Sequence, residues 1–260
     1  MTKHSCTALL SGFKSKSGSL NCFNDNKCKE KIDNKPVLPR SLLFKMKRSR
    51  GLKKFKTGIV TNTQFYDGTT AAAFSKQKNK GGKSIKKIAN GLNFALENKL
   101  LDLSFSGGLD TFRNTVSKQN NDIVTTKERM QSFNDSLDDP LVGMFASEEL
   151  LFEDERCNEN NENEPSLSEM AEKAVELLAS TSENGFFLMV EAGNIERAHQ
   201  KTQGLRAVNE AVELDSAVHG GFRKKIHENC LKFSDCNDFF GLKIGFFVQK
   251  TFQKTILYKQ

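Results

Sequence analysis

The stretch from residue 165 to residue 217 constrains the fold most, because its pattern predicts a helix, a buried strand and a second helix in direct succession. Ser166 and Glu169 have the S-x-x-E spacing of a capping box, which predicts that a helix begins there. Apolar residues then recur at helical spacing. They are Leu167, Met170, Ala171, Ala174, Val175 and Leu178. These signals predict an amphipathic helix that packs on a core.

A short apolar run, GFFLMV at residues 185–190, follows this helix and ends at Glu191. Such a run is typical of a parallel-sheet strand that carries a polar residue to its carboxyl end. Glu196, His199 and Gln200 come next, within one helical turn and on roughly one side. We expect the same helix to run on through Leu205, Val208 and Val212. The succession of elements predicts an α/β fold.

These motifs resemble the alkaline phosphatases. PSLSEMAEKAVELL, FFLMVEAGNIERAHQ and AVNEAVELDSA follow one another with the spacing of that family's PSLxEM, FVEGGRIDHxHH and AxxExxxxDxA motifs. The resemblance implies a mostly parallel sheet with helices on both faces. It also implies hydrolysis of phosphate monoesters through a phosphoserine, with zinc and magnesium as cofactors, by an enzyme that is usually a homodimer.

Carried over by position, the resemblance assigns Glu191 to the magnesium site. Glu196 stands at the place of a zinc-binding aspartate, and Gln200 at that of a zinc-binding histidine. His199 matches the neighbouring histidine, which is not a ligand. Because glutamine has no imidazole nitrogen and its carbonyl oxygen is a poor zinc ligand, we expect a damaged zinc site. An open alternative is that His199 turns in as a substitute ligand.

A second segment, TGIVTNTQFYDGTTAAAF at residues 57–74, resembles the family's G-[IV]-V-[ST]-T-x-x-x-[HD]-A-[ST]-P-A-A pattern. The resemblance implies that Thr69 is a second magnesium ligand and that Asp67 lies beside it. Thr70 stands where the family has a proline. Lys80 takes the place of an arginine that binds the substrate phosphate. Lysine keeps the charge but not the bidentate geometry, so phosphate orientation would suffer.

The resemblance puts the nucleophile at the amino terminus. An ungapped register anchored on Gly12 and Lys14 assigns it to Thr2, whereas a gapped register that matches S-x-C-T-A assigns it to Ser5. A hydroxyl is a weak nucleophile until a metal or a base lowers its pKa. The family's Asp-His motif is absent, since no such dipeptide occurs in the chain. Two hypotheses follow, an active phosphomonoesterase and a truncated, catalytically inactive pseudoenzyme, and the second is favoured.

We expect one partial alkaline-phosphatase-like domain over residues 1–218 and an unmatched tail, rich in Phe and Lys, over residues 219–260. Polar linkers are expected near residues 21–39, 113–139 and 153–164. Parallel strands are expected near residues 57–63, 100–105 and 186–190. The family's first strand would lie before Met1, so the tail is the candidate to cover the sheet there. Its FVQKTFQKTILY segment predicts an edge strand.

The chain has 260 residues and a net charge of +7, with its densest basic run, KMKRSRGLKKFK, at residues 45–56. The run supports a third hypothesis, a basic nucleic-acid-binding protein. No RNP-like aromatic motif, zinc finger or heptad accompanies it, so we interpret it as a solvated face and expect no nucleic-acid partner. The family is extracellular and often carries a GPI anchor. Neither a signal peptide, an anchor signal nor a transmembrane span is read here, which leaves the localisation open.

Overall fold

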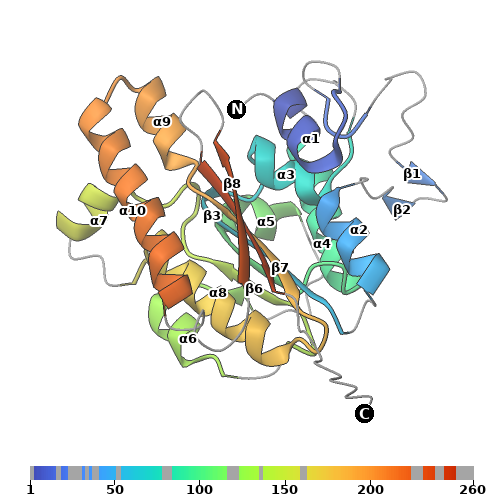
Figure 1. Ribbon diagram of the computed structural model, residues 1–260. Coiled ribbons are helices and arrows are strands. Elements are labelled where there is room, and N and C mark those ends of the chain that lie inside the picture. Colours follow the sequence, from blue (N-terminus) through green and yellow to red (C-terminus); the bar gives the residue numbers. More distant parts are fainter. Residues whose placement is uncertain are drawn as a thin grey trace, which may run out of the picture.

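A seven-stranded sheet with helices on both faces forms the centre of the molecule (Figure 1). The computed structural model describes residues 3–15, 19–22, 31–32, 35–36, 41–50, 54–77, 84–115, 123–134, 137–158, 163–223, 231–237 and 243–249. The strands of the large sheet are β3 (Lys56–Gln64), β4 (Leu103–Gly107), β5 (Ile123–Val124), β6 (Leu141–Met144), β7 (Phe186–Glu191), β8 (Leu231–Asn237) and β9 (Lys243–Gln249). Two further strands, β1 (Lys31–Ile32) and β2 (Lys35–Pro36), pair with each other.

The strand order is β5-β6-β4-β3-β7-β9-β8, and the first five strands are parallel. The strands predicted near residues 57–63, 100–105 and 186–190 are therefore confirmed. Strand β4 begins later than predicted because Leu100 and Leu101 belong to the turn before it. Their backbone N–H groups donate to the carbonyl of Ala95 at 2.8 and 3.2 Å.

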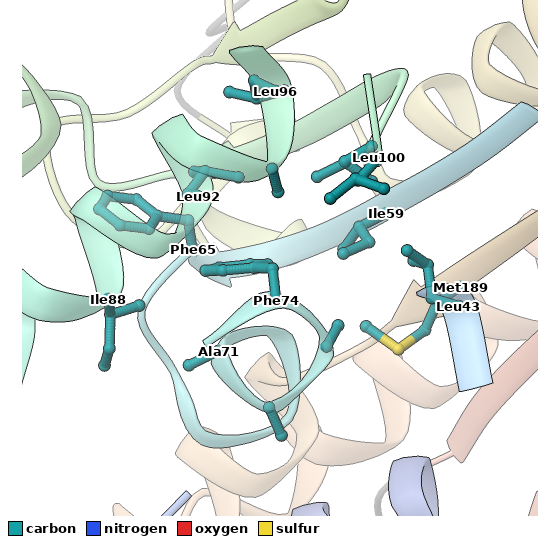
Figure 2. Packing of buried hydrophobic residues seen from close by; sticks show 14 of the residues in the cluster. Leu43, Ile59, Phe65, Ala71, Phe74, Ile88, Leu92, Leu96, Leu100 and Met189 are labelled. Atoms are coloured by element: carbon teal, nitrogen blue, oxygen red, sulfur yellow. The ribbon is translucent and has the colours of Figure 1, made fainter. Parts of the chain in front are cut away.

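The helices lie on the two faces of this sheet (Figure 1). They are α1 (Lys3–Ser11), α2 (Leu42–Arg50), α3 (Gly68–Phe74), α4 (Ser84–Glu97), α5 (Leu109–Thr115), α6 (Lys127–Ser132), α7 (Glu153–Asn158), α8 (Leu167–Thr181), α9 (Asn194–Gln200) and α10 (Gly204–Arg223). On one face, residues of α2, α3 and α4 pack on β3 and β7, and Figure 2 shows Phe74, Leu92 and Leu43 around Ile59 and Met189. Burial of these apolar side chains attaches this helical layer to the sheet.

The opposite face carries α8, whose start has the capping box that the sequence predicts. The Ser166 hydroxyl accepts a hydrogen bond from the backbone N–H of Glu169 at 3.2 Å, and the Glu169 carboxylate accepts one from the N–H of Ser166 at 2.9 Å. The apolar face of α8 packs on β3 and β7 in a second buried cluster. The helix predicted from capping and periodicity is confirmed.

The predicted linkers contain secondary structure where the structure describes them. Residues 113–139 include β5 and α6, and their side chains of Val124, Met130 and Leu137 are buried. Residues 153–164 include α7, while residues 21–39 include β1 and β2. Within the described residues, these polar segments therefore contain short helices and strands.

The helix predicted to continue from residue 196 through residue 212 is instead two helices, so that prediction is wrong. Helix α9 ends at Gln200, Thr202 has a positive φ of 56°, and α10 begins at Gly204. The apolar residues through which the helix was expected to run are exposed in α10: Leu205 is 78%, Val208 58% and Val212 61% exposed. The buried side of α10 consists of Ala207, Glu210, Leu214 and Ala217. Leu214 and Ala217 pack in the buried cluster that contains the apolar residues of α8, whereas Ala207 packs with Phe152 and Ala198.

The tail adds strands to the sheet beyond β7. Strand β9 pairs antiparallel with β7, from Phe187 opposite Val248 to Glu191 opposite Ile244. Strand β8 pairs with the other side of β9 and forms the outer position of the sheet. The predicted edge strand was therefore misplaced, because its first residues, 247–249, belong to an interior strand. Its remaining residues lie outside the described part of the chain.

Two lysines of the basic run at residues 45–56 are buried, contrary to the prediction of a solvated face. Lys47 and Lys56 both pair with Asp102, and Asp102 also accepts a hydrogen bond from the backbone N–H of Thr57 at 2.8 Å. Burial lowers the pKa of Lys47, while Asp102 opposes that shift. The paired carboxylate offsets the free-energy cost of burying these two lysine charges at the amino end of β3.

Candidate metal site

The candidate site lies where β3 and β7 end at the same edge of the sheet. The two strands are parallel neighbours, and Thr61 is directly opposite Glu191 in the register. Helix α3 follows β3, and α9 follows β7. Ligands of open parallel sheets bind at this carboxyl edge. The fold therefore collects side chains from β3, β7 and the first turn of α3 in one place.

Glu191 is 1% exposed, and hydroxyl groups surround its carboxylate. Thr61 Oγ1 donates to Glu191 Oε2 at 3.0 Å, and Thr70 Oγ1 donates to the same oxygen at 2.9 Å. Thr69 donates to this carboxylate as well. Burial raises the pKa of Glu191 to about 7, the negative charge of Asp67 adds to the shift, and the threonine hydroxyls oppose it.

The start of α3 holds two of these threonines. Asp67 is the N-cap, and its carboxylate accepts a hydrogen bond from the backbone N–H of Gly68 at 2.6 Å. This cap fixes the first turn, in which Thr69 and Thr70 are both 1% exposed. The structure therefore brings Thr69 into contact with Glu191 and keeps Asp67 near enough to act on it through its charge.

Helix α1 reaches the same place through Cys6. Its Sγ lies 3.4 Å from Thr69 Oγ1, and burial raises the pKa of the thiol to about 12. Ser5, one candidate nucleophile, precedes Cys6 in α1, and the structure describes its backbone there. The other candidate, Thr2, and the predicted phosphate-binding residue Lys80 lie outside the described residues.

The residues predicted at the zinc site lie together on α9. The amide of Gln200 donates to Glu196 Oε1 at 3.2 Å, so these two side chains bind each other one turn apart. His199 is exposed, whereas Glu196 is half-buried. Among the residues that the structure describes, no three His, Cys, Asp or Glu side chains converge to hold a metal ion. The structure thus brings Glu191 and Thr69 together, whereas the side-chain amide of Gln200 donates to Glu196 on the same helix.

Sequence reasoning missed the hydroxyl donors Thr61 and Thr70 at Glu191. The signal for Thr61 was its position near the end of a strand that neighbours β7, because parallel neighbours bring their carboxyl ends together. Thr70 was noticed only as a replacement for proline. Its hydroxyl function could not be inferred until the distance between α3 and β7 was known.

A second buried carboxyl, Glu210 on α10, was also missed. Its Oε2 accepts from Asn62 Nδ2 at 3.0 Å and its Oε1 from the N–H of Glu153 at 2.7 Å. Asn62 Oδ1 in turn accepts from the N–H of Asn194, the first residue of α9, at 3.2 Å. Burial raises the pKa of Glu210 to about 7. This network fixes α9 and α10 to the end of β3.

Comparisons with known proteins agree with this architecture. The alkaline phosphatase family model matches residues 102–235, which is just over half of the chain and includes part of the predicted tail. An alkaline phosphatase of Gadus morhua is 40% identical over 106 residues, which cover 41% of this chain and 21% of that protein. An alkaline phosphatase of Escherichia fergusonii is 27% identical over 226 residues, covering 69% of this chain and 47% of that protein.

Solved alkaline phosphatases share the fold. The cold-active enzyme of Shewanella sp. superposes with a TM-score of 0.66 at 22% identity, covering 90% of this chain and 52% of that chain. A variant of the TAB5 enzyme, solved with Mg bound, has a TM-score of 0.64 at 18% identity. The chain therefore spans about half the length of the Shewanella enzyme and a smaller share of the length of the Gadus morhua enzyme.

A membrane-bound alkaline phosphatase of Bombyx mori is 25% identical over 201 residues. In the described part of this chain, no helix combines the length and the apolar character that a membrane crossing requires. The family match over half of the sequence and the fold shared with solved alkaline phosphatases agree with one another. This chain belongs to the alkaline phosphatase family.

Proposed function

We propose that this chain binds a divalent cation of the magnesium type at Glu191 and Thr69, and that it does not hydrolyse phosphate monoesters by itself. The proposal of a cation site rests on the surroundings of Glu191. Its carboxylate is buried among threonine hydroxyls, and no lysine or arginine of the described residues pairs with it. A buried carboxylate without a basic partner is costly, and a bound cation would offset that cost.

The chemistry of the donors favours magnesium over zinc. Glu191 offers carboxylate oxygen and Thr69 a hydroxyl oxygen, and the charge of Asp67 acts on the same place. Hard cations prefer oxygen ligands, whereas zinc prefers imidazole and thiolate. The TAB5 relative with bound Mg agrees with this choice. A bound magnesium ion would supply positive charge that stabilises negative charge beside α1.

The proposal of inactivity depends on α9. A zinc-dependent phosphatase needs imidazole and carboxylate ligands that hold its zinc ions beside the reacting phosphate. Here Gln200 stands at a ligand position, and its amide N–H donates to Glu196 Oε1 at 3.2 Å. The alternative remains an active phosphomonoesterase, possessing Ser5 or Thr2 as nucleophile, Lys80 on the phosphate and His199 as a replacement zinc ligand. It would act on phosphate monoesters, as a homodimer.

Thermal unfolding with increasing Mg²⁺ tests the cation site. We expect the melting temperature to rise saturably with Mg²⁺ in the unsubstituted chain and not in Glu191→Gln. Glu183→Gln removes an exposed carboxylate elsewhere and should keep the rise. No saturable rise in the unsubstituted chain would contradict the cation site.

Turnover of p-nitrophenyl phosphate with added Zn²⁺ and Mg²⁺ tests the second part, and we expect none above background. Turnover that is abolished by a chelator and by Ser5→Ala or Thr2→Ala would show an active enzyme. Stoichiometric Zn²⁺ that survives dialysis in the unsubstituted chain but not in His199→Ala would assign a ligand role to His199.

A further inference from the structure

Thr70 differs from the residue that the family pattern has at its position, and the structure gives its side chain a specific contact. The first backbone hydrogen bond of α3 runs from the N–H of Ala71 to the carbonyl of Asp67 at 2.8 Å. The N–H of residue 70 therefore has no place in the helical ladder, and a proline is tolerated in such a first turn. What threonine adds at this position is a hydroxyl group.

That hydroxyl is directed at the carboxylate of Glu191. Thr70 Oγ1 lies 2.9 Å from Glu191 Oε2, and Thr61 Oγ1 lies 3.0 Å from the same atom. All three side chains are buried. The two donors come from different elements, α3 and β3, so they approach Oε2 from two directions and fix the plane of the carboxylate.

An ionised carboxylate has about two acceptor positions on each oxygen. Thr61 and Thr70 occupy those of Oε2, so a cation reaches Glu191 through Oε1. Thr61 is itself held by Thr63, whose hydroxyl lies 3.0 Å away and whose N–H donates to Thr61 Oγ1 at 3.2 Å. Thr69, also on α3, donates to the same carboxylate. Thr70 is thus one of two donors from the helix side and the one that donates to Oε2 at 2.9 Å, so its loss would loosen the orientation of the carboxylate.

We infer that Thr70 is a positioning residue for the cation site: its hydroxyl holds Glu191 Oε2 so that Oε1 faces the ion. This role rests on the cation site proposed above. Partners that orient a metal ligand typically change metal affinity by about ten- to a hundredfold when they are removed. Thr70→Val keeps the shape of the side chain and removes the donor, whereas Thr70→Ser keeps the donor.

The test is a Mg²⁺ titration of the full chain, followed by thermal unfolding and repeated with Mn²⁺ by electron paramagnetic resonance. We expect Thr70→Val to need about ten times more metal for half-saturation, or more. Thr70→Ser should bind as the unsubstituted chain does. Because serine keeps the hydroxyl and lacks the methyl group, normal binding by Thr70→Ser would show that the hydroxyl, and not packing of the methyl group, determines the metal affinity.

Thr57→Val is the matched control, because Thr57 is also a buried threonine on β3 that donates to a buried carboxylate, Asp102, at 3.2 Å. It should lower the melting temperature without changing the metal affinity. Equal affinities in Thr70→Val and the unsubstituted chain would overturn the role of Thr70 alone. Absence of saturable binding in the unsubstituted chain would overturn both this role and the cation site itself.

Discussion

Lys47 on α2 and Asp102, which directly precedes β4, form a buried ion pair at the end of the sheet opposite Glu191. Their side chains are 0% and 5% exposed. Asp102 also faces Lys56 at 3.6 Å and accepts from Thr57. One carboxylate therefore compensates two buried lysines and joins α2, β3 and β4.

Asp102→Ala should destabilise the chain strongly, because it leaves two buried lysines without a carboxylate: Lys47 loses its ion pair, and Lys56 keeps only the carbonyl of Leu137 at 2.6 Å. Removal of one member of a buried ion pair costs about 3–5 kcal/mol. Urea unfolding followed by circular dichroism measures the change in the free energy of unfolding. Glu183→Ala, which breaks the exposed pair with Lys54, should leave the midpoint almost unchanged. Similar midpoints for the two variants would contradict the structural role of Asp102.

Glu210 should make stability depend on pH. Its pKa is raised from 4.5 to about 7 by burial, and the nearby carboxylates of Glu153, Glu213 and Asp154 contribute. The folded chain therefore holds a proton that the unfolded chain has lost. This contribution to stability is complete below about pH 4.5 and is lost as the pH rises through about 7.

Glu210→Gln cannot ionise, so its stability should fall less than that of the unsubstituted chain between pH 5 and pH 8. The difference is up to about 3 kcal/mol, from about 1.4 kcal/mol for each pKa unit. Glutamine has one acceptor oxygen for two donors, Asn62 and the N–H of Glu153, so the variant starts from a lower stability. Parallel curves of unfolding free energy against pH would show that Glu210 does not titrate as described.

The capping box gives a smaller and local prediction. Ser166→Ala removes the acceptor for the N–H of Glu169 and should cost about 1 kcal/mol of stability. Ser180→Ala, near the other end of α8, removes a hydroxyl that bonds to the carbonyl of Leu177 and should change stability by less than about 0.5 kcal/mol. Equal effects in urea unfolding would mean that the cap does not stabilise the helix.

Local signals in the sequence predicted the centre of the fold. The apolar run before Glu191 and the GIV segment around Ile59 are buried on both faces of a parallel sheet, which makes their composition distinctive. The capping box at Ser166 depends on residues three apart, so it too could be read directly. The end of one helix at Gln200 could not, since a non-glycine residue, Thr202, takes the positive φ that separates α9 from α10.

Contacts between distant segments account for what the sequence did not predict. Lys47 is buried because Asp102 lies beside it, 55 positions further along the chain. Thr70 and Glu191 are 121 positions apart, and the role of the threonine depends on their distance in space. The resemblance named Glu191 and Thr69 as neighbours, whereas the hydroxyl donors and the Asn62–Glu210 network required the packed structure.

Gly107, at the carboxyl end of β4, should not tolerate a side chain. A Cβ there would lie 1.9 Å from the backbone oxygen of Glu148. Backbone cannot rotate away as a side chain does, so the loop around Glu148 would have to move. That loop continues to Leu150, whose N–H donates to the carbonyl of Asn62 at 3.2 Å and whose carbonyl accepts from Asn194 at 3.3 Å.

Gly107→Ala should therefore lower stability by about 1–3 kcal/mol, as overpacking does, and loosen the attachment of α9. Gly204→Ala is the matched control, since a Cβ at this first residue of α10 meets nothing within 4 Å. It should leave stability unchanged or raise it by up to about 1 kcal/mol. Urea unfolding of both variants, with hydrogen exchange of the α9 amides, measures the two effects. If Gly107→Ala has the same urea midpoint as the unsubstituted chain and its α9 amides are equally protected from hydrogen exchange, the close contact between β4 and the loop does not fix α9 as described.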